Sequence, residues 1–528
     1  MPVLALLRIF ALLKKVSMGI MSQETKKILR EHKCKWSIEK ILWQKHPVFG
    51  KTIYNLIYQV MTLITPFITT PYISRVLGAD GTGVQSYTNS VVQYFAILAA
   101  LGTASYGQRE IARHRDEIKM RSRLFWEIEV LCMATTAACL IIWLFVIGFA
   151  REYRPYYVVL TMTLLAVAFD ISWFFGGLEQ YSLIVLRNTA VKLVGIAMLF
   201  LFIREKEDLL LYVALTAATG LLGNISMWGY LKGQVEKPVL KELRPLRHLK
   251  ETLVYFIPTI ATSVYTILDK TMLGWFSGEN KSQNGYYEYA TGFVNMAKIL
   301  IMSFNAVMSA RMSYLFGTGR MEEIHKRFQD SLDFVLLMAM PIMLGLAGIA
   351  AQFIPWFLGN GYLPVTFLMY VCSPLVLVVG LSDCIGSQIL TPGGKRAQSG
   401  KVIVAGAMVN ACLNFLLIPH FAALGAAAAS VAAECFITSL YLWLGRDFIK
   451  LKMLVRYGWR RLVAAVIMLG AVVWTGQFLE QVRGLGPITT FIQIGAGAVV
   501  YFLVLLVMRD PFLYQYLGKI YRRLTGQP

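Results

Sequence analysis

A lysine lies near the middle of an apolar stretch, Tyr286–Arg311, that is long enough to cross a bilayer as a helix. A lysine at the centre of a membrane helix costs about 2.5–3.5 kcal/mol on insertion scales. Polar residues recur along this stretch at helical spacing and would form one stripe: Glu288, Thr291, Asn295, Lys298, Asn305 and Ser309. Because lipid cannot solvate such a stripe, we expect it to face protein or a water-filled cavity. Lys298 then either binds a substrate or pairs with a buried carboxylate and fixes packing.

A second apolar stretch, 84–106, carries a shorter stripe of three amide side chains: Gln85, Asn89 and Gln93. This stripe has Ala96 where the first has Lys298, so the positive charge is asymmetric. The two stretches resemble each other at an offset of 202 residues, as GVQSYTNSVVQ from Gly83 and GYYEYATGFVN from Gly285 show. An even number of apolar stretches separates them, which predicts parallel repeats with a substrate site at their interface, near mid-membrane.

Other charged residues fall inside or at the ends of apolar stretches. The basic ones form a candidate anion site together with Lys298: Lys192, Arg75, Arg187 and Arg311. Such a cationic cavity would suit a phosphate or pyrophosphate. Candidates for supporting polar or ion-coupling roles are Asp170, Asp269, Lys270, Asn295, Asn89 and Gln93. Alternatives remain open, because Asp269 and Lys270 could form a structural pair with each other or with a neighbouring group, and Arg311 could be a topology anchor instead of a cavity floor.

The remaining acidic residues receive simpler interpretations. Asp383 and Glu434 lie inside apolar stretches, and the run GAAAASVAAE before Glu434 favours a role in tight helix packing. Glu127, Glu129 and Asp333 lie close to the ends of stretches, so we expect them to be solvated.

The composition places these residues in a membrane protein. Of 528 residues, 57% are hydrophobic and 15% charged, with a mean hydropathy of +0.57, whereas soluble domains average about 25% charged. About fourteen stretches are long enough to span a bilayer. They lie near 52–74, 84–106, 124–149, 155–175, 183–203, 208–230, 252–274, 286–310, 328–350, 365–390, 402–419, 422–444, 462–479 and 488–508. The sequence therefore predicts an all-α polytopic membrane protein.

The basic residues are distributed unevenly between the two sides of the predicted bundle. With all fourteen stretches threaded from a cytoplasmic N-terminus, 41 of the 51 Lys and Arg fall on the inner side and seven on the outer side. This is the positive-inside pattern, so the net charge of +21 reflects topology and not a nucleic-acid partner. Both termini are expected to be cytoplasmic.

No other chemistry is visible in the sequence. The cysteines form no CxxC pair, the histidines show no ligand spacing, and TPGGKRAQSGK lacks P-loop spacing, so we expect no metal, cofactor or nucleotide hydrolysis. Energy would come from ion or voltage gradients or from substrate consumption. Residues 1–20 predict a short interfacial helix, or an upstream start with Met18 or Met21 as the true initiator.

These observations predict six segments along the chain. They are a basic N-terminal segment (1–50), an N-lobe of six spans (51–232), a basic linker (233–251), a C-lobe of six spans (252–445), two appended spans (446–508) and a basic tail (509–528).

Four runs resemble the polysaccharide flippases, the O-antigen and capsule repeat-unit translocases of the multidrug/oligosaccharidyl-lipid/polysaccharide exporter superfamily. They are PYISRVLGADGTGVQSYTNSVVQYF (71–95), LGTASYGQREIARHRD (101–116), DISWFFGGLEQYSLIVLRNTAVK (170–192) and IPTIATSVYTILDKTMLG (257–274). The resemblance covers residues 50 to 445. One departure is Ala310, where relatives usually show a proline before the arginine, which puts the placement of Arg311 in doubt.

The resemblance implies two six-helix lobes in parallel pseudo-repeat around a cationic cleft. It implies transport of undecaprenyl-diphosphate-linked oligosaccharide from the inner to the outer leaflet of a bacterial plasma membrane. The lipid tail would stay in the bilayer, and the appended spans would form a groove for it. Implied partners are this lipid-linked substrate, membrane lipid, and a glycan polymerase and glycosyltransferases of the same pathway, with the chain itself a monomer.

Two other functions compete with flipping. A cation-coupled multidrug exporter on the same fold would favour an acidic cleft, which Asp170, Asp383 and Glu434 keep open but Lys192 and Lys298 oppose. A membrane enzyme such as a glycan polymerase would need a sizeable outer loop with an acid–base pair, whereas the longest outer loop here, near 275–285, is short. We therefore expect a transporter and not an enzyme.

Overall fold

The computed structural model describes residues 47–278, 280–449, 451–514 and 518. The regular structure of these residues is helical throughout, and no strand occurs among them, which confirms the all-α fold. The segment expected to hold an interfacial helix or an alternative start, and most of the basic tail, lie outside the described residues.

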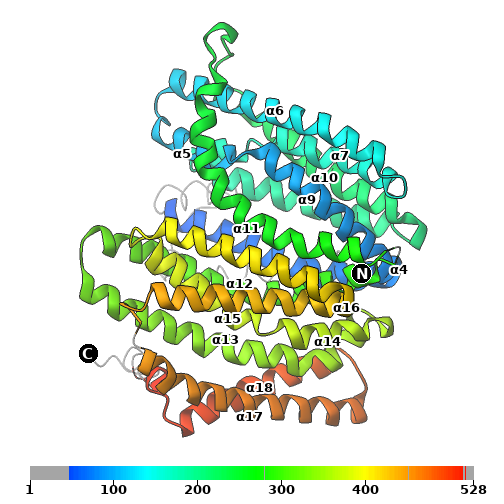
Figure 1. Cartoon of the computed structure of the whole chain (residues 1–528), viewed down its shortest axis with the longest axis vertical. Coiled ribbons are helices and arrows are strands. Elements are labelled where there is room, and N and C mark those ends of the chain that lie inside the picture. The colour runs from blue at the N-terminus through cyan, green and yellow to red at the C-terminus, as the bar shows by residue number, and fades with distance from the viewer. Residues whose placement is uncertain (1–46, 279, 450, 515–517, 519–528) are drawn as a thin grey trace, which may run out of the picture.

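One half of the molecule, which we call the N-lobe, is drawn in blue to green in the upper part of Figure 1. Its helices are α4 (Pro47–Ala100), α5 (Thr103–Arg113), α6 (Ile118–Phe149), α7 (Arg154–Ala168), α8 (Ser172–Gly177), α9 (Tyr181–Phe202) and α10 (Leu209–Trp228). α4 is broken at Gly78, whose φ of 72° is a left-handed conformation that glycine adopts without strain. α4 therefore comprises two spans.

The other half, the C-lobe, lies below it in the same view, except that its first helix, α11, runs alongside the N-lobe. It comprises α11 (Leu249–Phe276), α12 (Ser282–Gly317), α13 (Met321–Phe357), α14 (Leu363–Cys372), α15 (Leu375–Ile385) and α16 (Arg396–Leu444), with a π-helical turn, η6 (Gly386–Leu390), after α15. α16 is broken at Ala422, which has a φ of 48°. It therefore also supplies two spans.

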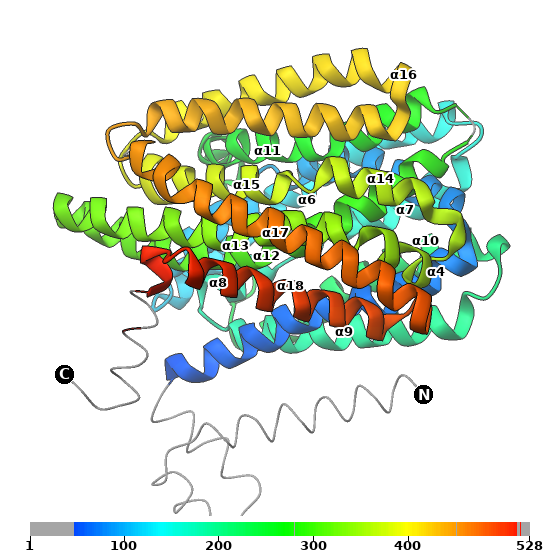
Figure 2. The same cartoon turned by 90° about the horizontal axis from the view of Figure 1, so that it is seen from below.

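The last two helices, α17 (Leu451–Arg483) and α18 (Pro487–Val507), form a separate pair. They lie side by side at the edge of the C-lobe in Figures 1 and 2 and pack on α13. The buried Arg461 of α17 fixes this pair through its guanidinium, which is 2.8 Å from Asp333 of α13 and 3.2 Å from Asp510. Asp333 is thus paired and not free in solvent, contrary to the sequence-based expectation.

Each of the fourteen expected stretches coincides with a helix or with part of a broken one. Within the described ranges, nine helices are individually long and apolar enough to cross a membrane, and the bent pair α14–α15, with its break near residue 373, forms a tenth candidate. The polytopic architecture predicted from hydropathy is therefore confirmed.

Each lobe has its own apolar core. In the C-lobe, Phe293 and Phe353 belong to one large buried cluster. In the N-lobe, one cluster surrounds Trp143 and a second surrounds Phe125 and Phe174. Each lobe thus buries apolar side chains of its own, and the lobes also contact each other away from the closest approach, where α11 packs on α4 and α5.

The two lobes meet most closely at the end formed by residues 74–83, 281–289 and 356–362, which we call the sealed end. A β-carbon on Gly83 would lie 1.8 Å from the carbonyl oxygen of Lys281, and one on Gly285 would lie 2.0 Å from that of Ala79. Gly285 and Lys281 are the repeat counterparts of Gly83 and Ala79 at the 202-residue offset. The two contacts are thus the same contact made twice, as expected around a pseudo-two-fold axis.

Further contacts at the sealed end are hydrogen bonds between the lobes. Tyr362 donates to the carbonyl of Ser74 at 2.6 Å, and the hydroxyls of Thr82 and Tyr289 are 2.8 Å apart. The ammonium of Lys281 lies over the rings of Tyr87 and Tyr153 of the N-lobe, at 4.7 and 5.5 Å from their centroids. Cation–π contacts of this kind contribute about 0.5–2 kcal/mol each.

Enlarging Gly83 tests the backbone contact at the sealed end. We expect Gly83→Val to separate the lobes there, because the added atoms would overlap the Lys281 carbonyl and overpacking typically costs about 1–3 kcal/mol. The readout is labelling by an impermeant maleimide of Ser86→Cys, a position buried beneath the seal, in a chain whose native cysteines are replaced by serine. Labelling should rise several-fold with Gly83→Val. Gly292→Val is the matched control because a β-carbon there meets open space, and equal labelling in both variants would contradict the contact.

Candidate functional site

A cavity of about 1100 Å³ lies below the sealed end, between the second half of α4 and helices α11, α12, α15, η6 and α16. The whole α4 stripe and the first four residues of the α12 stripe line it, whereas Asn305 and Ser309 donate hydrogen bonds to the carbonyls of Gly380 and Ser387 instead. Its polar lining includes Gln85, Asn89 and Gln93 from α4 and Glu288, Thr291, Asn295 and Lys298 from α12. The two repeats therefore present corresponding helices to one water-accessible space, which is why these polar groups can lie within the apolar bundle.

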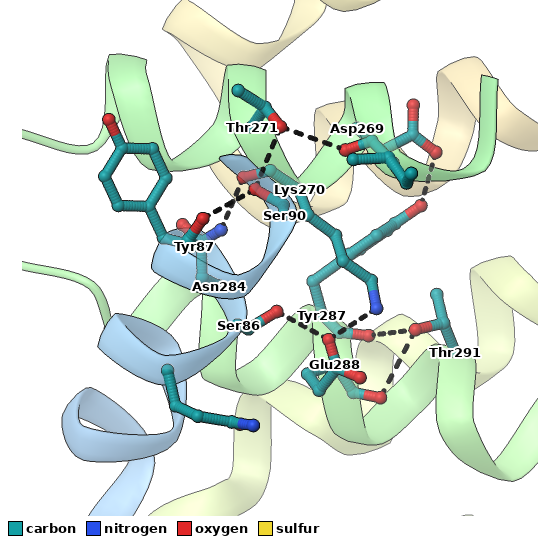
Figure 3. Close-up of polar contacts among 12 residues, drawn as sticks. Ser86, Tyr87, Ser90, Asp269, Lys270, Thr271, Asn284, Tyr287, Glu288 and Thr291 are labelled. Carbon is teal, nitrogen blue, oxygen red and sulfur yellow. Dashed lines mark hydrogen bonds and ion pairs between the residues drawn. The ribbon is translucent and has the colours of Figure 1, made fainter. Parts of the chain in front are cut away.

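The stripes meet directly at the end of the cavity nearest the seal. Lys270 of α11 forms an ion pair with Glu288 at 2.6 Å, and Ser86 of α4 donates to the same carboxylate at 2.5 Å (Figure 3). Ser86 and Glu288 are repeat counterparts, so this bond lies close to the pseudo-two-fold axis. One carboxylate thus joins a lysine of the C-lobe to a serine of the N-lobe.

Asp269 does not pair with its neighbour Lys270. Its carboxylate is buried and accepts hydrogen bonds from Tyr287 at 2.7 Å, Ser430 at 2.5 Å and Asn414 at 2.6 Å. Figure 3 shows Asp269 and Lys270 directed toward different partners, Tyr287 and Glu288. The possible internal pair left open by the sequence is therefore not formed.

Lys298 lies in the cavity wall, half-buried. Within the described residues it is not within ion-pair distance of a carboxylate, although the charge of Glu434 across the cavity acts on it. The charged lining comprises Lys270, Lys298, Asp269, Glu288, Asp383 and Glu434. Four of these six are acidic, so the lining is not the predominantly basic surface that the sequence led us to expect.

The other predicted basic residues lie outside this lining. Arg75 is exposed at the sealed end and donates to the carbonyl of Trp356 at 2.5 Å. Arg311 is exposed and pairs with Glu323 at 3.0 Å, which makes it no part of a cavity floor. The remaining two contact N-lobe side chains: Arg187 is 3.2 Å from Asn224 and Lys192 is 2.7 Å from Thr62.

Asp170 also lies outside the lining and caps the turn before α8, accepting from the backbone N–H of Ser172 at 3.0 Å. Glu434, interpreted from sequence as a packing residue, lines the cavity instead. Asp383 lines it too and accepts from Asn305 of α12 at 2.9 Å. The apolar sequence around Asp383 and Glu434 did not indicate that they line a cavity. For Asp383, the π-helical turn that follows it cannot be predicted from helical periodicity.

Glu127 and Glu129 are buried, contrary to the expectation that they are solvated. The linker before α11 covers Glu127 through Arg247 and His248, whereas α5 packs on α6 and Trp173 of α8 lies next to Glu129. Segments distant in sequence thus bury them, which proximity to the end of an apolar stretch could not indicate.

Comparison with known proteins agrees with this arrangement. Residues 48–315, just over half of the chain, match the family described as polysaccharide biosynthesis protein. The chain belongs to this family. Its relatives include a protein of Escherichia coli (strain K12) named "Putative O-antigen transporter", 23% identical over 75% of this chain and 96% of the relative. A protein of the same name from Shigella dysenteriae is 22% identical over 71% and 94%.

Solved structures of low sequence identity share the fold of this family member. The lipid II flippase MurJ in an inward closed conformation aligns with a TM-score of 0.65 at 14% identity, covering 88% of this chain and 99% of that one. An inward-facing multidrug resistance MATE transporter of the MOP superfamily aligns with a TM-score of 0.57 at 12% identity, covering 73% and 97%. The chain is thus a multi-pass membrane protein with a transporter fold.

The Lys270–Glu288 pair can be tested by a double-mutant cycle. We expect Lys270→Met and Glu288→Gln each to lower the free energy of unfolding in detergent, because each leaves a charge in the cavity without its partner. The double variant should be more stable than the sum of the single effects predicts, by about 0.5–3 kcal/mol. Strictly additive effects would show that the pair contributes nothing.

Proposed function

We propose that this protein is a flippase that moves undecaprenyl-diphosphate-linked oligosaccharide repeat units from the inner to the outer leaflet of a bacterial plasma membrane. The observation that carries the proposal is the polar cavity between two lobes that are joined at one end. A headgroup of sugars and phosphates needs a route through the bilayer on which its polar groups remain hydrogen-bonded. The relatives named as O-antigen transporters support this class of substrate.

The chemistry of the cavity wall fits such a headgroup. The amides of Gln85, Asn89, Gln93 and Asn295 both donate and accept hydrogen bonds, as sugar hydroxyls do. Lys298 supplies the charge for a diphosphate, at the cost of its attraction to Glu434. The tail would remain in lipid, and α17 and α18 offer it an apolar outer surface that includes the exposed Trp474 and Phe478.

The distribution of basic residues orients the protein. The loops opposite the sealed end hold most of the Lys and Arg, which supports an orientation with that end outside and both termini in the cytoplasm. The structure then represents a state closed toward the outside, before release. Moving two negative charges outward across about 100 mV would release at most ~4.6 kcal/mol, so the membrane potential assists the step.

Multidrug export is the second candidate, and the four carboxylates of the cavity favour it. Two of them are already satisfied, because Glu288 pairs with Lys270 and Asp269 accepts three hydrogen bonds. Asp383 and Glu434 are the other two carboxylates of the lining, and the charge of Lys298 offsets part of theirs, so the acidic excess is smaller than the lining suggests.

Lys298 is the residue on which glycan export should depend. We expect Lys298→Ala to lower surface polysaccharide by tenfold or more, because a hydrogen bond to a charged group contributes about 1.5–3 kcal/mol. Lys298→Arg should retain part of the export, and protein abundance in the membrane should not change. Arg311→Ala, outside the cavity, is the control. Normal export by Lys298→Ala would refute the site, and unchanged glycan with lost drug resistance would favour the second candidate.

Lys192 should also be required, although it lies outside the cavity lining in this state. Its contact with Thr62 places it on the N-lobe, which would contribute to the route when the lobes move apart. We expect Lys192→Ala to reduce export in the same assay. An export level equal to that of the Arg311→Ala control would limit the site to the C-lobe.

Asp269 is proposed as the ion-coupling group. Around its carboxylate, Asn414 has a buried oxygen and Asn410 a buried nitrogen without hydrogen-bond partners, and Ser430 adds a hydroxyl. Carboxylate, amide and hydroxyl oxygens are ligands for hard cations. We expect NaCl, compared with choline chloride, to raise the thermal unfolding midpoint of the wild type but not of Asp269→Asn. An equal shift in both proteins would exclude a sodium site at Asp269.

A further inference from the structure

Two buried glutamates lie two residues apart on α6 and have opposite surroundings. Glu127 is fully buried and is held by Arg123 at 3.0 Å, Arg247 at 2.5 Å and His248 at 2.8 Å. Two guanidinium groups and a histidine thus compensate its negative charge. Glu127 is therefore a structural anion that attaches the linker between the lobes to α6.

Glu129 has no such compensation. It is 1% exposed, and neither of its carboxyl oxygens has a hydrogen-bond partner in the part of the chain that the structure describes. Its neighbours are the thiol of Cys132 on the same helix, the indole of Trp173 on α8 and the carboxyl of Asp170. Asp170 is the charged group that acts on it, and it is of the same sign. An ionised carboxylate in this position would be unsolvated, unpaired and repelled.

We propose that Glu129 is a proton-binding site of the N-lobe, occupied in this conformation. The ligand is H⁺, which forms the O–H bond of the carboxylic acid and removes the charge that the surroundings cannot stabilise. The hydroxyl of Thr136, two turns along the same face of α6, is also buried without a partner. Among the described residues, the indole of Trp173 is the donor that acts on the Glu129 carboxyl and no positive charge does, so the site is a polar interior without charge compensation that lies apart from the cavity.

The elements that cover Glu129 are suited to respond to its charge. α5 and α8 each begin after a break in the preceding helix, at Leu101–Gly102 for α5 and at 169–171 for α8. They pack tightly together, since a β-carbon on Gly107 would lie 2.5 Å from the Trp173 ring. Loss of the proton would require water at Glu129, and the simplest way to admit it is to separate these two short helices.

This cover is connected to the helix that joins the lobes. A β-carbon on Gly102 would lie 2.8 Å from the backbone N of Phe256 and from the carbonyl oxygen of Thr252, both on α11. A displacement of α5 would therefore also displace α11 or break this contact. The protonated acid favours the closed cover and so this state of the lobes, and release of the proton favours a different one. Binding of a proton at Glu129 is thus linked to movement of the lobes. This link does not depend on which substrate is transported.

Infrared spectroscopy of the purified full-length protein tests the site without any substrate. The wild type at pH 7 should show the carbonyl stretch of a protonated carboxylic acid that is missing in Glu129→Gln. The band should remain in Asp116→Asn, where the carboxylate at the same end of the molecule is 93% exposed. A band of the same intensity in Glu129→Gln would overturn the proposal. Should Glu129→Gln not fold, Glu129→Asp must shift the band, and an unshifted band would overturn it equally.

The link to the cover is tested by a buried cysteine at Thr103 of α5, in a chain without native cysteines. The rate at which a methanethiosulfonate labels Thr103→Cys should rise more steeply with pH than in the same chain carrying Glu129→Gln. Identical pH dependence would show that the proton does not control the cover. Both measurements use protein without substrate, whereas the proposed flippase function is measured by glycan export. A negative result for Glu129 is therefore distinguishable from a negative result for the flippase function.

Discussion

The close approach of two backbones at Gly83 and Gly285 is the contact on which the arrangement of the lobes depends. Only hydrogen atoms fit between each glycine and the opposing carbonyl, so the second half of α4 and the beginning of α12 lie directly against each other. The same contact made twice fixes both the separation and the rotation of the lobes. Below it the two helices present their polar stripes to one cavity, and Ser86 reaches Glu288.

The absence of water in lipid explains how the charges of the bundle are arranged. Most of the buried charges have specific partners: Glu288 has Lys270, Glu127 has two arginines, and Arg461 has two aspartates. Lys298 and Glu129 differ from this pattern in complementary ways. Lys298 lies in the wall of the cavity, and Glu129 is enclosed where a charge has no support. In the functions that we propose, these are the two groups whose state changes, one by binding an anion and the other by losing a proton.

The contacts that stabilise each lobe are different from the contacts that join the lobes at the sealed end. The appended helices are fixed to α13 by Arg461 and its aspartates, and each lobe has its own core. The lobes can consequently move as units while their cores stay intact. What must break when the sealed end opens is a limited set of hydrogen bonds, the cation–π contacts of Lys281 with two tyrosines, and the backbone contacts of the glycines.

The sequence by itself determined the helices, the pairing of the repeats and the two stripes. Hydropathy, the 202-residue offset and helical spacing can all be read from the order of residues along the chain. It could not decide which charges share the cavity. Glu434 lines it, although its sequence surroundings favoured a packing role, and Arg311, for which a topology anchor and a cavity floor were both open, does not. It also misjudged Glu127 and Glu129, which are buried by segments far away in the chain. The partner and the burial of a charged residue depend on the rotation of its helix and on where that helix breaks. Both are decided by packing against side chains that are distant in the sequence.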